Sequence, residues 1–137
     1  MSARRILLIE DDTSEAVLAT RTLHKILPDA QVEVVENGLQ ALDFLSSEDF
    51  PADIAFALMD LHMPGMGGLE FLQRVQDADM ARPFPLIVFS SSEDPDEIAR
   101  AYQLGASAFV TKPVEPARYR LAMEHIVNFW LATNRLS

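Results

Sequence analysis

The sequence has no cysteine, only 5 glycines among 137 residues, and few basic residues. Without cysteine, neither a disulfide framework nor a thiolate metal site is available, and the composition suits a reducing compartment. The 11 lysines and arginines stand against 21 acidic residues, which gives a net charge of -10 at pH 7. Because this balance repels a polyanion such as DNA, direct nucleic-acid binding is not expected.

Long hydrophobic runs are also absent. The N-terminal stretch MSARRILLIEDD has only four consecutive apolar residues, too few for a signal-peptide core, and no run elsewhere approaches a membrane span. We therefore expect no membrane segment and a cytoplasmic location. With 49% apolar and 23% charged residues, the composition is that of a globular protein. Its length predicts a single domain over residues 1–137, with no separate output domain.

Short apolar runs alternate with segments of helical spacing. The apolar runs are 6–9, 32–35, 54–59, 85–89 and 108–110. Several are apolar throughout, which is typical of strands buried on both faces of a sheet. The helical segments are 13–27, 38–45, 68–75, 94–105 and a last one that starts near 115. Strict alternation predicts an α/β three-layer sandwich with a five-stranded parallel sheet between helices, and we adopt the flavodoxin-like strand order 2-1-3-4-5 as the hypothesis.

Two of the predicted helices have clear N-terminal signals. Asp12 and Glu15 are spaced like the members of a capping box, which favours Asp12 as a helix cap over a metal ligand. Asp94 is followed by Pro95, an N-cap residue before a proline at the first helical position.

Polar residues come directly after the apolar runs, at the sheet edge where ligands bind in open parallel α/β sheets. Glu10 and Asp11 follow the first run, Asp60 the third, Ser90 ends the fourth and Lys112 follows the fifth. In the strand order 2-1-3-4-5 the carboxylates crowd together, and their repulsion calls for a divalent cation. An all-oxygen set with open positions suits Mg²⁺, for which Mn²⁺ is a substitute.

These residue types are the parts that in-line phosphoryl transfer requires. Lys112 supplies a positive charge and Ser90 a hydroxyl donor for phosphoryl oxygens, and most of the catalysis is positioning and charge neutralisation. With its carboxylate as the acceptor, Asp60 becomes an aspartyl phosphate. The simpler alternatives are a helix cap for Asp60, a helix-entry serine for Ser90 and a solvated surface charge for Lys112.

The motifs ILLIEDD, ALMDLHMPGMGG, PLIVFSSS and GASAFVTKP make the chain resemble the receiver domains of two-component response regulators over essentially its whole length. The resemblance implies that Asp60 accepts a phosphoryl group from a sensor histidine kinase. It implies that Asp11 is a direct magnesium ligand, that Glu10 acts largely through a metal-bound water, and that the backbone carbonyl of His62 completes the metal shell.

Further residues take roles from the same resemblance. Ser90 and Phe109 match the hydroxyl and aromatic pair that rearranges on phosphorylation, and Lys112 matches the phosphate-binding lysine. His62 and Ser92 occupy positions where the family tunes dephosphorylation. The Lys112–Pro113 bond is expected to be cis, as is usual in the family. Phe109 is a core aromatic in either case.

The last predicted helix has two apolar stripes where one would suffice for packing on the sheet. The stripe expected to face the sheet is Tyr119, Ala122, Met123, Ile126 and Trp130. The second contains Leu121, Phe129 and Leu136, an aligned series that indicates an interface. We expect a two-fold homodimer through the predicted helix 94–105, the strand 108–110 and the last helix. A C-terminal segment folded over this stripe is the alternative.

The resemblance thus implies a regulatory switch and not an enzyme: phosphorylation at Asp60 is expected to change which surface is presented. The ending VNFWL resembles stand-alone regulators that pair with phytochrome-type light-sensing histidine kinases. One alternative is a phosphate shuttle or sink in a relay, which uses the same chemistry. Another is a metal-dependent aspartyl-phosphate phosphatase, although such enzymes usually have Asp-x-Asp where this chain has Glu10-x-Asp12. The last alternative is an interaction module that works independently of phosphorylation.

Overall fold

Five parallel strands form one sheet in the order β2-β1-β3-β4-β5. The computed structural model describes residues 5–48, 53–80 and 84–133 of the chain. The strands are β1 Arg5–Ile9, β2 Gln31–Val35, β3 Ile54–Met59, β4 Leu86–Ser90 and β5 Ala108–Thr111. The predicted flavodoxin-like fold and strand order are confirmed.

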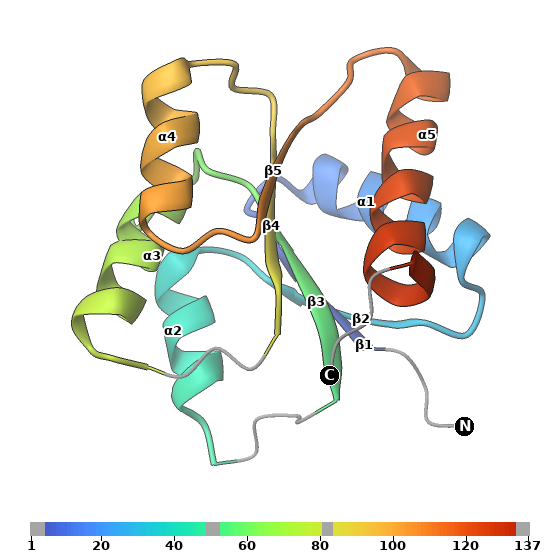
Figure 1. The fold of residues 1–137 in the computed structure, drawn as a ribbon. Helices are drawn as coiled ribbons and strands as arrows, with labels where there is room; N and C mark the ends of the chain where they lie inside the picture. Colours follow the sequence, from blue (N-terminus) through green and yellow to red (C-terminus); the bar gives the residue numbers. More distant parts are fainter. Residues whose placement is uncertain (1–4, 49–52, 81–83, 134–137) are drawn as a thin grey trace.

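Helices cover both faces of this sheet (Figure 1). They are α1 Thr13–Ile26, α2 Gly38–Ser46, α3 Gly68–Asp77, α4 Pro95–Gln103 and α5 Pro116–Val127, followed by a π-helical segment η1 Asn128–Thr133. Figure 1 shows α2, α3 and α4 on one side of the sheet and α1 and α5 on the other. In the described parts of the chain, no helix is long and apolar enough to cross a bilayer.

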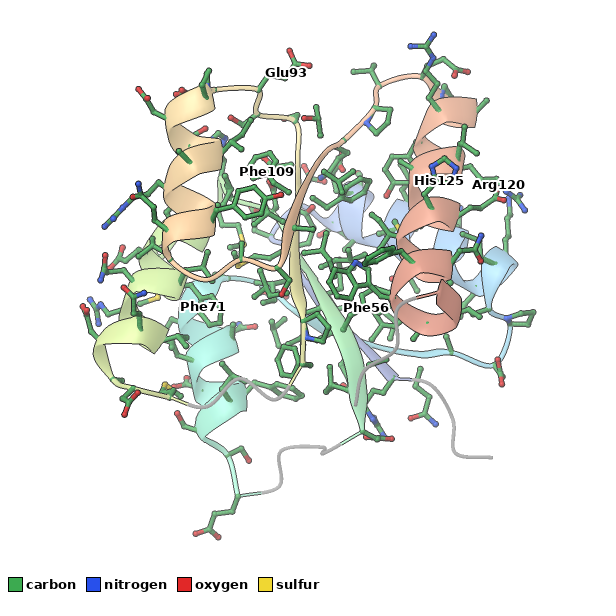
Figure 2. All side chains as sticks on the ribbon, in the orientation of Figure 1. Phe56, Phe71, Glu93, Phe109, Arg120 and His125 are labelled. Carbon is green, nitrogen blue, oxygen red and sulfur yellow. The ribbon has the colours of Figure 1, made fainter. Side chains whose placement is uncertain are left out.

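The core is split into two layers by the alternation of side chains along the strands. On β1, Leu7 points into the cluster under α2, α3 and α4, while its neighbour Ile6 points into the cluster under α1 and α5. Phe56 of β3 and Phe71 of α3 fill opposite layers, as Figure 2 shows. Both rings are essentially fully buried, and burial of one such side chain stabilises the fold by about 1.5–3 kcal/mol. Strands buried on both faces explain the apolar runs.

The predicted helix caps are present, but the capping box at α1 is only half formed. Asp12 Oδ1 accepts a hydrogen bond from the Glu15 backbone N–H at 3.0 Å, and Asp94 caps α4 by accepting from the Asp96 N–H. The reciprocal bond from the Glu15 side chain to Asp12 is not made. Instead the Asp12 N–H donates to Glu10 Oε2 at 3.3 Å, and the Glu15 carboxylate binds Lys112.

The predicted cis bond before Pro113 is wrong. No cis peptide bond occurs in the described part of the chain. An X–Pro bond favours the trans form intrinsically by about 0.5–1 kcal/mol, and the segment follows that preference while the Lys112 N–H donates to Ser90 O at 2.8 Å.

The two stripes predicted for the last helix, which the structure divides into α5 and η1, differ in exposure, as predicted. Of the stripe expected to face the sheet, Tyr119, Met123 and Ile126 are buried, and Ala122 and Trp130 are partly buried. On the other stripe, Leu121 is 50% exposed and Phe129 is 48% exposed. Leu136, the third residue assigned to that stripe, lies outside the described residues.

Candidate functional site

Three carboxylates meet at the carboxyl ends of β1 and β3. Glu10, Asp11 and Asp60 each offer an oxygen, and these oxygens lie within 4.8 Å of one another. They meet because β1 and β3 are neighbours whose last residues, Ile9 and Met59, pair in register. The structure therefore brings together the acids that the sequence grouped as metal ligands.

Glu10 is the buried member of this cluster, with 5% of its surface exposed. Burial raises its pKa to about 7; the nearby charge of Lys112 counteracts this shift, while the negative charge of Asp60 adds to it. The ionised form of Glu10 is therefore not fully stabilised by its neighbours at neutral pH. A divalent cation would supply the missing positive charge. Together with the oxygen-only donor set, this fits Mg²⁺ or Mn²⁺.

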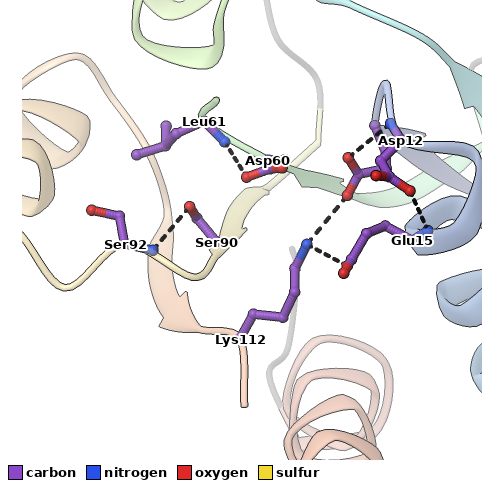
Figure 3. Close-up of polar contacts among 8 residues, drawn as sticks. Asp12, Glu15, Asp60, Leu61, Ser90, Ser92 and Lys112 are labelled. Carbon is purple, nitrogen blue, oxygen red and sulfur yellow. Dashed lines mark hydrogen bonds and ion pairs between the residues drawn. The ribbon is translucent and has the colours of Figure 1, made fainter. Parts of the chain in front are cut away.

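Lys112 reaches this cluster from the end of β5. Its Nζ lies 3.2 Å from Glu10 Oε1 and 2.9 Å from Glu15 Oε2 (Figure 3), and its side chain is 11% exposed. Burial favours a lower pKa for Lys112. The hydrogen bond to Glu15 and the charges of Glu10, Asp60 and Glu15 outweigh burial and raise the pKa. The ammonium therefore keeps its positive charge beside the acids, which is what a phosphoryl-binding group needs.

Ser90 and Asp60 stand at the ends of the adjacent strands β4 and β3 (Figure 3). The Ser90 side chain is fully buried, and its Oγ accepts a hydrogen bond from the Ser92 N–H at 3.3 Å. Asp60 Oδ1 accepts from the Leu61 N–H at 2.8 Å. The Ser90 hydroxyl is therefore held at the end of the strand next to the one that leads to Asp60.

The β3–α3 loop below Asp60 depends on close backbone packing. A Cβ on Gly68 would lie 2.8 Å from the Asp60 carbonyl oxygen, so a larger residue cannot be placed there without moving backbone. The Gly68 N–H also donates to Leu61 O at 2.8 Å. A second contact, from the Gly38 N–H to Met66 O at 3.0 Å, ties the loop to the start of α2.

Three hydrogen-bonded side chains, His62, Glu97 and Ser92, lie beside the site. His62 Nε2 lies 2.8 Å from Glu97 Oε2, and the other Glu97 oxygen accepts from Ser92 Oγ. The hydrogen bond to Glu97 raises the pKa of His62, and the hydrogen bonds from His62 and Ser92 lower the pKa of Glu97. His62 and Ser92 are predicted from the sequence, but Glu97 is not, since its position on α4 carries no motif.

Phe109 lies on β5, where it pairs with Val88 of β4. Its ring is partly buried and packs into the layer that α4 covers (Figure 2). Its backbone N–H donates to the Tyr102 hydroxyl of α4 at 3.0 Å. The residue is thus a core aromatic between β5 and α4, and its part in a switch with Ser90 stays a prediction.

The strand order and the acid cluster at the carboxyl edge define a doubly wound α/β protein with a carboxylate-rich ligand site. A family model described as the response regulator receiver domain matches residues 6–124. The chain belongs to this family of two-component signalling regulators, as the motifs predict.

Curated relatives differ in how much of their length the chain covers. The chain is 28% identical over 135 residues to the "Probable methanogenesis regulatory protein FilR2" of Methanothrix harundinacea, covering 95% of the chain and 85% of that protein. It is 36% identical over 116 residues to the sensory/regulatory protein RpfC of Xanthomonas campestris. This match covers 83% of the chain but only 15% of RpfC. The match to RpfC therefore concerns one part of a much longer protein.

Solved structures match along almost the whole chain. The phosphorylated cyanobacterial phytochrome response regulator RcpA has a TM-score of 0.86 at 26% identity, over 98% of this chain and 99% of that one. The Mn²⁺-bound form of response regulator Rcp1 has a TM-score of 0.83 at 28% identity over the same shares. RPA3017, described from red light signalling of R. palustris, has a TM-score of 0.84 at 27% identity and covers 98% of both chains.

Proposed function

We propose that the chain, as one receiver domain over residues 1–137, accepts a phosphoryl group from a sensor histidine kinase onto Asp60 in a Mg²⁺-dependent reaction. The observation that carries this proposal is the meeting of Glu10, Asp11 and Asp60 within 4.8 Å, with Lys112 held at 3.2 Å from Glu10. Family membership supports a regulatory role rather than turnover of a metabolite.

The reaction transfers a phosphoryl group, so that a P–O bond to Asp60 replaces the P–N bond of a phosphohistidine. A carboxylate oxygen of Asp60 attacks the phosphorus of a phosphohistidine, the P–N bond breaks, and the electron pair leaves with the imidazole. Lys112 and the Ser90 hydroxyl bind phosphoryl oxygens as the charge moves onto Asp60. Asp11, Asp60 and the carbonyl of His62 would hold the metal directly and Glu10 through water. The bound ion supplies charge neutralisation between the acids and the phosphoryl group.

Phosphorylation then acts as a switch by favouring one of two conformations. Ser90 follows the phosphoryl oxygen that it binds, and Phe109 moves in response between β5 and α4. The Phe109 N–H bond to Tyr102 links that strand to the exposed side of α4, where Tyr102 is 49% exposed. The surface built from α4, β5 and α5 is therefore the one we expect to change.

We assign the exposed stripe formed by Leu121 of α5 and Phe129 of η1 to a homodimer through α4, β5 and α5. A cavity of about 570 Å³ lies beside Phe129 and Trp130, lined also by Ala108 and Val110 of β5. Large apolar side chains beside an open apolar cavity favour a protein partner, and a second copy presents the same face in a two-fold arrangement.

The cognate kinase is proposed to be of the phytochrome type. The support is the likeness over 98% of the chain to structures described as a phytochrome response regulator and as a regulator in red light signalling. The cytoplasmic location expected from the sequence stays a prediction.

The proposal is tested by incubating the protein with acetyl phosphate and Mg²⁺ and measuring intact mass. We expect a mass increase of one phosphoryl group that is lost with a chelator and in the Asp60→Asn variant. Lys112→Ala is expected to lower the yield strongly, because the phosphoryl charge loses its cation. Labelling that persists in Asp60→Asn would refute Asp60 as the acceptor.

A further inference from the structure

The Lys112 ammonium already has two carboxylate partners, Glu10 and Glu15. Among the described residues, Lys112 forms no ion pair with Asp60, the residue whose phosphoryl group it is expected to bind. Its two hydrogen bonds go to Glu15 in the first turn of α1 and to Glu10 at the end of β1 (Figure 3). Lys112 must therefore reorganise when a phosphoryl group arrives.

The two partners differ in how easily they release the ammonium. Glu10 is buried at the end of β1 and belongs to the acid cluster, so its pairing with Lys112 is compatible with a cation and a phosphoryl group beside it. Glu15 stands on the first turn of α1, and its side chain is 39% exposed. In the described part of the chain, Lys112 is the one side chain that the Glu15 carboxylate binds. Water can replace that contact.

There is also room for Glu15 and Lys112 to separate. Both residues line a cavity of about 410 Å³ between α1 and the start of α5, together with Pro113 and Tyr119. The cavity therefore leaves space for the Glu15 side chain to move once its contact with Lys112 is released.

We propose that Glu15 is a positioning residue that competes with the phosphoryl group for Lys112. In the unphosphorylated protein Glu15 holds the ammonium on the α1 side. A phosphoryl group carries about 1.5 to 2 negative charges near neutral pH against one for a carboxylate, so it draws Lys112 away and frees Glu15. Glu15 thereby weakens phosphoryl binding and links the state of Asp60 to the first turn of α1. This inference rests on the proposed phosphorylation of Asp60.

The test uses beryllofluoride with Mg²⁺ as a phosphoryl mimic and isothermal titration calorimetry as the measurement. Glu15→Gln is expected to bind the mimic about two- to five-fold more tightly than wild type, the range for loss of one partly exposed competing ion pair. The matched control is Glu93→Gln, which removes the same charge from an exposed loop at the same edge of the sheet (Figure 2). The control is expected to bind like wild type.

A purely structural role for Glu15 predicts the opposite sign. If the ion pair only braced α1 against β5, its loss would loosen the site and weaken binding of the mimic. Competition predicts a lower urea-unfolding midpoint for the metal-free Glu15→Gln variant together with tighter binding. Unchanged or weaker binding in Glu15→Gln, or equal tightening in Glu93→Gln, would overturn the inference.

The outcomes separate this inference from the proposed function. If wild type binds the mimic and Asp60→Asn does not, the function stands, and the Glu15→Gln result decides the inference alone. If wild type neither binds the mimic nor is phosphorylated by acetyl phosphate, the proposed function fails and the inference fails with it.

Discussion

Glu10 shows how one buried side chain sets the conditions under which this site works. Its carboxylate lies at the end of β1 with 5% of its surface exposed, and burial raises its pKa to about 7 from an ordinary value of 4.5. In the metal-free protein the folded state thus holds this proton more tightly than the unfolded chain. The resulting stabilisation is full below about pH 4.5 and is lost as the pH rises through about 7.

Magnesium affinity is predicted to rise as the pH increases through about 7. Metal binding needs the ionised carboxylate, so below that pH each ion must displace a proton from Glu10. Calorimetric titration with Mg²⁺ in two buffers of different ionisation enthalpy measures this release. The Glu10→Gln variant is expected to bind with little dependence on pH across that range. Equal proton release in wild type and Glu10→Gln would show that another group is responsible.

The individual hydrogen-bond partners in the site are the feature that the sequence predicts least well. Residues that follow strands, such as Asp60 and Lys112, are predictable because the strand order fixes which strand ends are neighbours. Glu15 and Glu97 lie on helices, and which distant side chain a helical carboxylate meets depends on how the helix packs. The spacing of Asp12 and Glu15 predicts a capping box. The Glu15 side chain binds Lys112 instead of the Asp12 N–H, which donates to Glu10.

At the scale of elements, the β3–α3 loop is held in place by backbone contacts that admit only glycine. Gly68 begins α3 directly against the Asp60 carbonyl. The loop therefore links the acceptor to the packing of α3, whose Phe71 and Leu72 are buried in the core.

Gly68→Ala is predicted to lower the free energy of unfolding by about 1–3 kcal/mol, the usual cost of an overpacked position. The added methyl group would lie 2.8 Å from Asp60 O, so Asp60 must shift and phosphorylation by acetyl phosphate is expected to slow. Urea unfolding and intact-mass labelling measure the two effects. Gln76→Ala, an exposed position near the end of the same helix, is the control and is expected to change neither.

The elements themselves follow closely from the sequence. The apolar runs 54–59 and 85–89 correspond to β3 and β4 within one residue, since strands buried on both faces must be apolar throughout. The predicted caps Asp12 and Asp94 begin α1 and α4. The isomer before Pro113 was not predictable from residue type, because the intrinsic difference between cis and trans is small.

At the scale of the whole molecule, Leu121 of α5 and Phe129 of η1 form an exposed apolar stripe beside the cavity at Phe129 and Trp130. The ring of Phe129 meets that of Trp130 edge-to-face, with centroids 4.9 Å apart. A rigid aromatic pair at a surface is an effective anchor for a protein interface.

Phe129→Glu is predicted to shift the proposed dimer to monomer, because a two-fold interface would bring two such charges together. Analytical ultracentrifugation across a concentration series measures the change. Leu39→Glu is the matched control, since Leu39 is 57% exposed on α2, outside the proposed face. A wild-type protein that is monomeric with and without beryllofluoride would rule out the dimer.

The central claim is that acids from separate strands, with a lysine beside them, make Asp60 a phosphoryl acceptor. Borohydride reduces an acyl phosphate to the alcohol, so it marks a phosphorylated aspartate as homoserine. After treatment with acetyl phosphate and Mg²⁺, tandem mass spectrometry of the reduced protein is predicted to find homoserine in place of Asp60, and only when the metal is present. Homoserine at another acid, or at position 60 regardless of metal, would contradict the account.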